Sequence, residues 1–380
     1  MVGTQTEPIE PTEPTEPAEP TGPTASSAAT SAGAHRLLGL DVARAVAFTG
    51  MLFAHFVGAR VPGEPGWLLA LDGAADGRAA TLFCVLLGVG AGLLVARGTP
   101  DRVLVRRGAA LLALGVLVWP LFEQVYLILP HYGVLLALVP LLRRLPDRAL
   151  LAGAGLAFVA TAAVAAVLGG HHLRVGDQPA SYGDLLDGFA LLRVVLWTGG
   201  YPLVGWVGFV LVGLWLARRR LGDRVVQVRL LVGGAAIAAL QPVLAWAYAA
   251  LDGETTTSTA GGLASILDGR AHSNRTAWYL LGTATAVAVL AAALLVTSGP
   301  GRRWLWPFGC LGQVALTAYL AHLVIGRRFV WPWTLRSDPR VPAQVAVVLV
   351  ILVAFVAVAT AWRSRFRRGP VEALLRAVSG

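Results

Sequence analysis

The sequence contains no lysine and has little charge of any kind. All 31 basic residues among its 380 are arginine, and charged residues make up only 14% of the chain, against 56% hydrophobic residues. A water-soluble domain of this size needs about a quarter of its residues charged to cover its surface. Because the apolar residues also come in long uninterrupted runs, the composition predicts a membrane protein whose surface is covered by lipid.

Cysteine is also scarce, and both copies, Cys84 and Cys310, lie inside apolar runs. This excludes a disulfide framework and a cysteine-based metal site, so we expect no metal. The net charge of +10 is compatible with nucleic-acid binding, but most arginines sit in short clusters between apolar runs. Such clusters set membrane topology, so we expect the lipid bilayer as a partner and no nucleic acid.

The sequence divides into three regions. Residues 1–34 repeat Glu-Pro units, which offer nothing to bury and predict a disordered tail. Residues 35–366 hold the apolar runs and are expected to form the membrane domain. Residues 367–380 are expected to form a short cytoplasmic C-terminal helix.

Ten apolar runs are long enough to cross a hydrocarbon core of about 30 Å. They are Leu37–Gly58, Ala79–Ala96, Val103–Trp119, Phe122–Leu142, Ala149–Gly169, Tyr201–Ala217, Val228–Leu251, Thr276–Thr297, Pro307–Ile325 and Val341–Trp362. The stretch Phe189–Thr198 is read as an extra half-helix or an interfacial segment. The sequence therefore predicts an all-α fold, a polytopic transmembrane helix bundle of about ten spans.

Charge orients this bundle. With the N-terminus cytoplasmic, five arginine clusters fall on the cytoplasmic side, as the positive-inside rule requires. They lie at 97–107, 143–148, 218–229, 302–303 and 363–368, whereas one outer loop, 327–340, breaks the pattern. We expect both the N-terminus and the C-terminus to be cytoplasmic, and a multi-pass protein of the plasma membrane.

The first span carries three polar side chains, Asp41, Arg44 and His55. Their spacing places them within an arc of roughly 60° on a helix, so one stripe faces the bundle interior. Asp41 and Arg44 are either an ion pair that locks packing or a functional pair. For His55 a function is favoured, because an apolar side chain could fill the same place without the free-energy cost of burying an imidazole.

Other titratable groups gather in the outer half of the predicted bundle. His131 and His322 lie in the outer parts of the fourth and ninth spans, His272 lies in an outer loop, and Arg78 opens the second span. We therefore expect the functional site in the outer half of the bundle.

Glycines give two further predictions. Gly88 and Gly92 form a GxxxG match, for which close helix packing is the ordinary explanation. Gly199–Pro202 predicts one helix break, with no clear counterpart elsewhere. A transporter usually carries such breaks in matching positions of two halves.

Five segments, in order, resemble one family. They are RLLGLDVARAVAFTGMLFAHF, DGRAATLFCVLLGVGAGLL, ILPHYGVLLAL, LGQVALTAYLAHLVIG and FRRGPVEALLR. Together they resemble the transmembrane acyltransferase superfamily, that is, heparan-alpha-glucosaminide N-acetyltransferase and its YeiB-like bacterial branch. The resemblance covers nearly everything after residue 35.

The resemblance implies a bacterial cell-envelope enzyme that takes acetyl or another acyl group from a cytoplasmic coenzyme A thioester. It passes this group to an amine or hydroxyl of a sugar or glycolipid acceptor on the outer face. The resemblance assigns the chemistry to a histidine near the outer end of the first helix or in the loop after it, and the only nearby histidine in this sequence is His55.

These implications assign roles to the polar residues. His55 is the expected base or nucleophile, His131 a relay or the acceptor-side base, and Arg78 the group that stabilises an oxyanion or binds an anionic acceptor. Asp41 and Arg44 are expected to orient acetyl-CoA or another acyl-CoA. Further pocket residues are Tyr132, Tyr201, His272, Ser273, Tyr319 and His322.

Two other functions are left open, a transporter and a lipid-handling or envelope scaffold protein. A homodimer is possible in each case.

Overall fold

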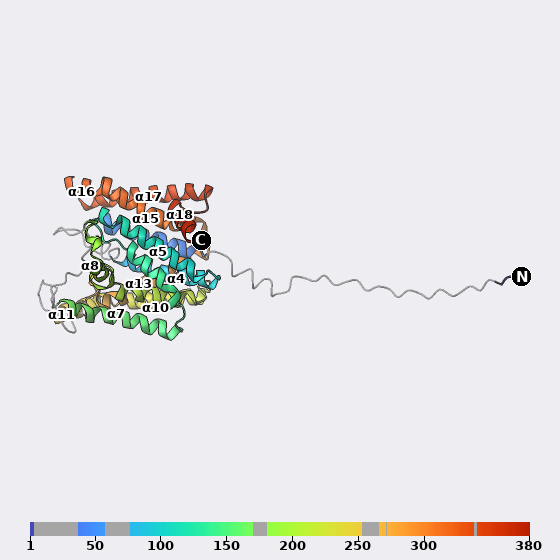
Figure 1. Ribbon diagram of the computed structural model, residues 1–380, viewed down its shortest axis with the longest axis horizontal. Helices are drawn as coiled ribbons and strands as arrows, with labels where there is room; N and C mark the ends of the chain where they lie inside the picture. Colours follow the sequence, from blue (N-terminus) through green and yellow to red (C-terminus); the bar gives the residue numbers. More distant parts are fainter. Residues whose placement is uncertain (4–36, 58–76, 170–180, 253–265, 271, 338–339) are drawn as a thin grey trace. The chain divides into compact units, whose positions relative to one another are not determined.

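The computed structural model describes residues 1–3, 37–57, 77–169, 181–252, 266–270, 272–337 and 340–380. Within these ranges every regular element is a helix (Figure 1), which confirms the all-α prediction. Residues Leu37–Gly380 form one compact unit, and Met1–Arg36 are a separate one. Apart from residues 1–3, the predicted Glu/Pro-rich tail lies outside the described residues.

The longer helices of the compact unit are α2 (Leu38–Phe56), α4 (Arg78–Ala96), α5 (Asp101–Val118), α7 (Asp147–Gly169), α9 (Leu203–Ala217), α10 (Arg224–Ala238), α13 (Thr276–Thr297) and α17 (Val341–Arg365). Shorter ones are α6 (Leu129–Leu142), α8 (Gly188–Arg193), α11 (Gln241–Asp252), α14 (Gly301–Gln313), α15 (Ala315–Ile325), α16 (Trp331–Ser337) and α18 (Pro370–Ser379). Single turns are η1 (Trp119–Leu121), η2 (Asp184–Leu186), η3 (Val194–Thr198) and η4 (Gly326–Val330).

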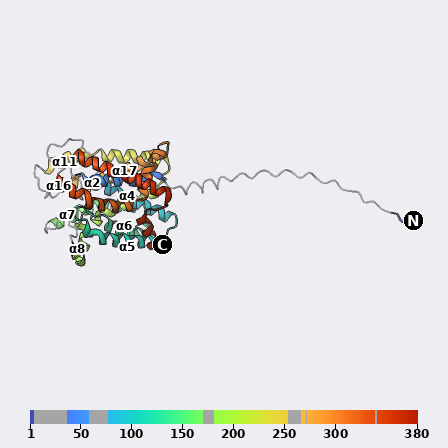
Figure 2. The same cartoon turned by 90° about the horizontal axis from the view of Figure 1, so that it is seen from above.

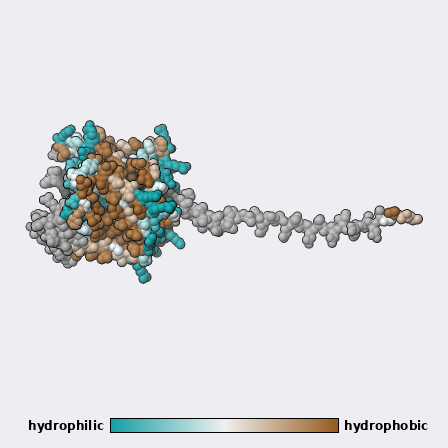
Figure 3. All heavy atoms as spheres, viewed as in Figure 1, coloured by the Kyte–Doolittle hydropathy of each residue, from teal (hydrophilic) through white to brown (hydrophobic). Residues whose placement is uncertain are grey.

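In the described part of the chain, 6 helical segments are long and apolar enough to cross a membrane, or up to 8 if each of two bent pairs is one span. An apolar band covers the middle of the bundle, and hydrophilic side chains gather toward its two ends (Figure 3). The protein is therefore a multi-pass helical membrane protein. The count of ten spans and the cytoplasmic position of both termini stay predictions.

The fourth apolar run is helical over a shorter range than predicted. Helix α6 begins at Leu129, whereas the prediction began at Phe122. At about 1.5 Å per residue, its 14 residues span about 21 Å, less than a hydrocarbon core. Pro130 fits this start, because a proline is well placed in the first turn of a helix, where its missing N–H needs no partner.

Two spans are broken, where the sequence predicted one break. The predicted break separates η3 from α9, and the axes on its two sides differ by 53°. The second lies at Val314, between α14 and α15, with a 72° bend. Nothing local marks this position strongly, since neither Val314 nor Gln313 is a helix breaker.

Close helix packing explains the GxxxG match. A Cβ added at Gly88 would clash with the carbonyl oxygen of Val210 and stand 2.8 Å from the Cα of Gly213 on α9. A Cβ at Gly92 would lie 2.5 Å from that of Ala217 on the same helix. The backbones of α4 and α9 therefore touch, as small residues at helix crossings allow.

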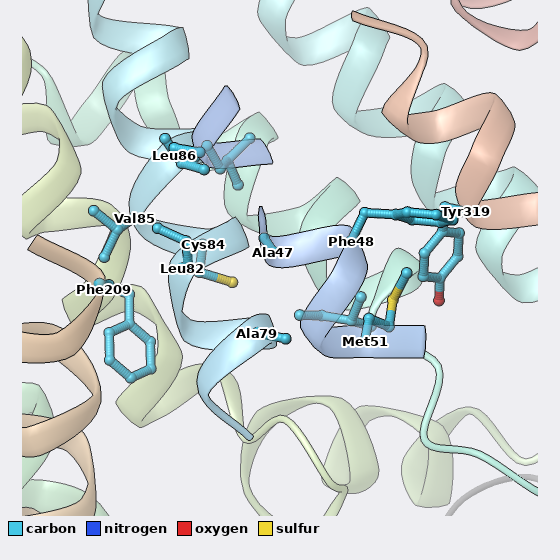
Figure 4. Packing of buried hydrophobic residues seen from close by; sticks show 14 of the residues in the cluster. Ala47, Phe48, Met51, Ala79, Leu82, Cys84, Val85, Leu86, Phe209 and Tyr319 are labelled. Atoms are coloured by element: carbon cyan, nitrogen blue, oxygen red, sulfur yellow. The ribbon is translucent and has the colours of Figure 1, made fainter. Parts of the chain in front are cut away.

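Helix α2 is the centre of this arrangement. Its Ala47, Phe48 and Met51 are buried, and Figure 4 shows them between the side chains of α4 and Tyr319 of α15. Such small and large side chains in alternation let neighbouring helices approach closely. The helix that carries His55 is thus held from two sides.

The two ends of the bundle differ in character. Helices α8, α11 and α16 lie at one end, and the C-terminus lies at the other (Figure 1 and Figure 2). Ion pairs join helix termini away from α16: Arg143 binds Asp101 at 2.8 Å, and Arg218 binds Asp147 at 2.7 Å. These contacts bring three of the predicted arginine clusters to one end, while the histidines discussed below lie near the α16 end.

Candidate functional site

A cavity of about 380 Å³ lies near the α16 end of the bundle. Its walls come from the end of α2, the start of α4, the segment between η1 and α6, the break between η3 and α9, the loop before α13, and α15. The lining residues are Met51, Ala54, His55, Gly77, Ala79, Ala80, Phe83, Gln124, Val125, Tyr126, Ile128, Tyr201, His272 and Tyr319. Its volume lies within the range of about 300–1,000 Å³ that small-molecule sites occupy.

Two histidines meet at one wall. His55, near the end of α2, lines the cavity, and its Nδ1 lies 3.0 Å from Nε2 of His322 on α15. The rings stack with centroids 5.2 Å apart. His322 is fully buried behind this contact. Trp331 of α16 donates its indole N–H to the His55 carbonyl at 3.1 Å, so both the ring and the backbone of His55 are held.

The hydrogen bond between the rings links their tautomers, because one ring must donate and the other accept. Nδ1 of His322 is buried and has no hydrogen-bond partner among the described residues. In one of the two tautomer pairs, His55 Nδ1 donates to His322 Nε2. In this tautomer the lone pair of His55 lies on Nε2, the nitrogen that acts as a base or nucleophile.

Aromatic rings form a second wall. The centroids of Tyr126 and Tyr201 each lie 6.1 Å from that of His272, and all three residues line the cavity. Tyr201 donates its hydroxyl to the carbonyl of Tyr126 at 3.1 Å, which joins the start of α9 to the segment before α6. This wall combines apolar ring faces with polar edges.

His131 lies behind the second wall. It is buried between Trp119 and Tyr201, whose ring centroids are 5.5 and 5.7 Å from its own, and it does not line the cavity. Tyr132 donates to the carbonyl of Phe83 at 3.4 Å, and Phe83 lines the cavity. The structure therefore does not bring His131 into contact with His55, which the relay predicted from the sequence would need.

Arg78 is buried and points toward α11 and α13. Its guanidinium donates to Thr285 Oγ1 at 2.8 Å and to Gln241 Oε1 at 2.7 Å. Its neighbours Gly77 and Ala79 line the cavity, but Arg78 does not. The contacts tie the start of α4 to two other helices.

Asp41 and Arg44 form an ion pair of 2.7 Å near the start of α2. Asp41 is buried, and Arg44 is about a quarter exposed. Fourteen residues separate Asp41 from His55, which is about 21 Å along a helix. The pair and the cavity histidine therefore lie at opposite ends of α2.

Sequence reasoning missed the lining segment before α6. Gln124 and Tyr126 lie there in non-helical backbone, although the apolar run had been read as helix. Non-helical backbone at membrane depth is tolerated where it lines a cavity. The polar pair Glu123-Gln124 between Pro120 and Pro130 is the signal that could have located it.

Two known families match the chain, and their matched ranges overlap. Residues 36–246 match the family described as heparan-alpha-glucosaminide N-acetyltransferase, catalytic, and residues 214–380 match a family described as protein of unknown function, DUF418. The chain belongs to the heparan-alpha-glucosaminide N-acetyltransferase catalytic family. None of the curated proteins matches the chain.

Membership of the heparan-alpha-glucosaminide N-acetyltransferase catalytic family makes the chain a relative of membrane acyltransferases. His55 lies in the region that this family matches, whereas His272 and His322 lie in the DUF418 region. Both regions thus contribute to one cavity. Among the described residues, no group of three or more His, Cys, Asp or Glu side chains could hold a metal ion.

Proposed function

We propose that the protein is an acyltransferase of the plasma membrane that moves an acetyl or other acyl group from an acyl-coenzyme A to a sugar or glycolipid acceptor. One observation carries the proposal. In a member of this acyltransferase family, a cavity-lining histidine, His55, is oriented by a buried second histidine, His322.

The chemistry needs one base in the cavity. His55 Nε2 takes the proton of an acceptor hydroxyl or amine as the acceptor atom attacks the thioester carbonyl carbon. The new C–O or C–N bond forms, the C–S bond breaks, and the proton passes from His55 to the coenzyme A thiolate. In a second route His55 Nε2 attacks the thioester carbon, the C–S bond breaks and the coenzyme A thiolate leaves, which gives an acyl-imidazole. The acceptor then attacks the acyl carbon, the N–acyl bond breaks, and the proton of the acceptor passes to the thiolate by way of the freed imidazole. His322 stabilises the imidazolium that the first route forms, through the Nδ1 contact.

The aromatic wall supports a sugar as acceptor. Sugar rings present apolar faces that pack on aromatic side chains and hydroxyls that hydrogen-bond to polar edges. Tyr126, Tyr201 and Tyr319 supply rings and hydroxyls to the lining, and Gln124 supplies an amide. A cavity of about 380 Å³ accommodates one sugar residue beside a short acyl group.

The donor is proposed to approach from the opposite end. Asp41 and Arg44 lie there, and the arginine clusters near Arg143 and Arg218 would attract the phosphates of coenzyme A. The thioester must then reach along α2 to His55. Replacement of Arg44 by Ala should raise the KM for acyl-coenzyme A and change the acceptor KM less.

The test is transfer of labelled acetyl from acetyl-coenzyme A to glucosamine or methyl glucoside by detergent-purified protein. His55→Asn keeps a donor near the Nδ1 position but cannot accept a proton at neutral pH, so transfer should fall at least 100-fold. Gln227→Ala removes another buried polar side chain, on α10, and serves as the control. Transfer by His55→Asn at the wild-type rate contradicts the proposal.

A transporter is the second candidate, and the two bent spans support it. Each bent pair places a tyrosine, Tyr201 or Tyr319, at the cavity wall. Broken helices around a central site are typical of secondary transporters. Uptake of the probe sugar into proteoliposomes without an acyl donor, and with no acetylated product, would favour this function.

A further inference from the structure

The loop before α13 holds two residues in an unusual backbone conformation. His272 and Asn274 have φ values of 55° and 52°, and no other non-glycine residue of the described ranges has a positive φ. This left-handed region is unfavourable for an L-residue, although Asn and His adopt it more readily than most. Such strain persists only where the surroundings enforce it, and it concentrates at functional sites.

A buried amide enforces the conformation. Asn274 is only 4% exposed, and its Oδ1 accepts from Trp206 Nε1 at 3.2 Å and from the Tyr279 hydroxyl at 3.1 Å. Its Nδ2 donates to the carbonyl of His272 at 3.3 Å. One side chain thus ties the strained His272 backbone to α9 and α13.

The other side of the loop is fixed as well. Ser273 donates its hydroxyl to the carbonyl of Asp268 at 3.0 Å, and the Asp268 carboxylate accepts from the Arg270 backbone at 3.0 Å. Asp268 is itself buried. The loop is therefore held by internal contacts on both sides of His272.

These contacts fix the position of the His272 imidazole. The His272 ring stacks on Trp278, with centroids 6.1 Å apart, and lines the cavity beside Tyr126 and Tyr201. His55 lines the same cavity from α2. The two histidines belong to separate walls, one built by α2 and α15 and the other by the aromatic group.

We propose that His272 is an acceptor-binding residue: it hydrogen-bonds a hydroxyl of a sugar and turns the reacting group toward His55. This inference rests on the proposed function for the identity of the second substrate. The hydrogen bonds of the loop hold the imidazole in place before the sugar arrives. Sugar binding therefore costs no conformational entropy for ordering this side chain. The sugar ring packs on Tyr126 and Tyr201, and His272 supplies the directional contact.

The variant that tests this is His272→Asn. Asparagine tolerates the left-handed region, so the loop keeps its backbone while the imidazole is lost. The acceptor KM for glucosamine or methyl glucoside should rise at least tenfold, and the KM for acetyl-coenzyme A should stay within twofold. Tyr248→Phe is the control, because it removes the hydroxyl on α11 that accepts an exposed hydrogen bond from Arg270 of the same loop.

A binding measurement separates this inference from the proposed function. The probe sugar is titrated against the purified protein, and the fluorescence of tryptophans such as Trp278, which stacks on His272, is followed. Weaker binding by His272→Asn, by tenfold or more, supports the role of His272 even if no transfer is found. Equal binding by wild type and variant overturns it, as does an unchanged acceptor KM in a wild type that transfers acetyl. A wild type that neither binds the probe sugars nor transfers acetyl overturns both proposals.

Discussion

Replacement of Glu372 by alanine should destabilise the protein more than any comparable surface change. Glu372 lies on α18, and its Oε1 accepts from the backbone N–H groups of Leu316 and Thr317 at 2.8 and 3.1 Å. Its Oε2 accepts from the Thr317 hydroxyl at 2.6 Å. The Thr317 hydroxyl in turn accepts from the backbone of Val371 at 3.1 Å. The C-terminal helix therefore caps α15 at the break at Val314.

The magnitude follows from these contacts. The first N–H groups of a helix have no partner within it, and a buried N–H left unsatisfied costs about 1–3 kcal/mol. Hydrogen bonds to a charged group contribute about 1.5–3 kcal/mol each. Because three donors share one half-buried carboxylate, their contributions overlap. We expect Glu372→Ala to lower the free energy of unfolding by about 2–4 kcal/mol.

The assay is reversible unfolding in mixed micelles, with Asp187→Ala as the matched control. Asp187 also caps a helix, because it accepts from the backbone of Phe189 and Ala190 at 3.1 and 3.0 Å, but these bonds are exposed. The control should lose less than about 1 kcal/mol. Glu372→Gln, which keeps an acceptor but loses the charge, should fall between the two. Equal losses for Glu372→Ala and Asp187→Ala would refute the argument that the cap is buried at the helix break.

Three further predictions concern single side chains. Gly88→Val should destabilise the fold by at least about 2 kcal/mol, because its side chain would separate α4 from α9. The control Gly155→Ala should be neutral or slightly stabilising, because nothing lies within 4 Å of its added Cβ. Both are read from the same unfolding assay. Arg78→Ala should lower the unfolding free energy by about 2–3 kcal/mol, because the part-buried hydrogen bonds of Thr285 and Gln241 to a buried charged donor are lost; a loss below about 0.5 kcal/mol would contradict this. His322→Ala should lower kcat at least tenfold without raising the KM for acyl-coenzyme A, and His322→Gln, whose carbonyl can accept from His55 Nδ1, should recover part of the rate. Equal rates for these two variants would show that His322 does not orient His55 by this hydrogen bond.

The local sequence was sufficient to predict the bounds of a helix where the span is uniformly apolar. The range Thr276–Thr297 is apolar throughout and has no internal proline, and α13 has these same bounds. The all-helical class and the membrane helices follow from composition and run length in the same way. The face of α2 that carries Asp41, Arg44 and His55 could also be predicted, because this prediction needs only the period of a helix.

Features that depend on distant contacts could not be placed in this way. The break at Val314 is stabilised by Glu372, 56 residues from Leu316, and no local residue announces it. His55 and His322 are 267 residues apart, so their contact is a property of the packed bundle. The start of α6 was misplaced because apolar residues dominate the lining segment and conceal its polar pair.

In the proposed reaction His55, held by His322, transfers an acyl group in the cavity. The most direct measurement is single-turnover transfer of labelled acetyl from acetyl-coenzyme A to glucosamine, with wild type, His55→Asn and Gln227→Ala in parallel. We expect labelled sugar from wild type and from Gln227→Ala, and at least a 100-fold slower reaction from a folded His55→Asn. Equal transfer by all three proteins, or none by a wild type that is folded and supplied with both substrates, would contradict it.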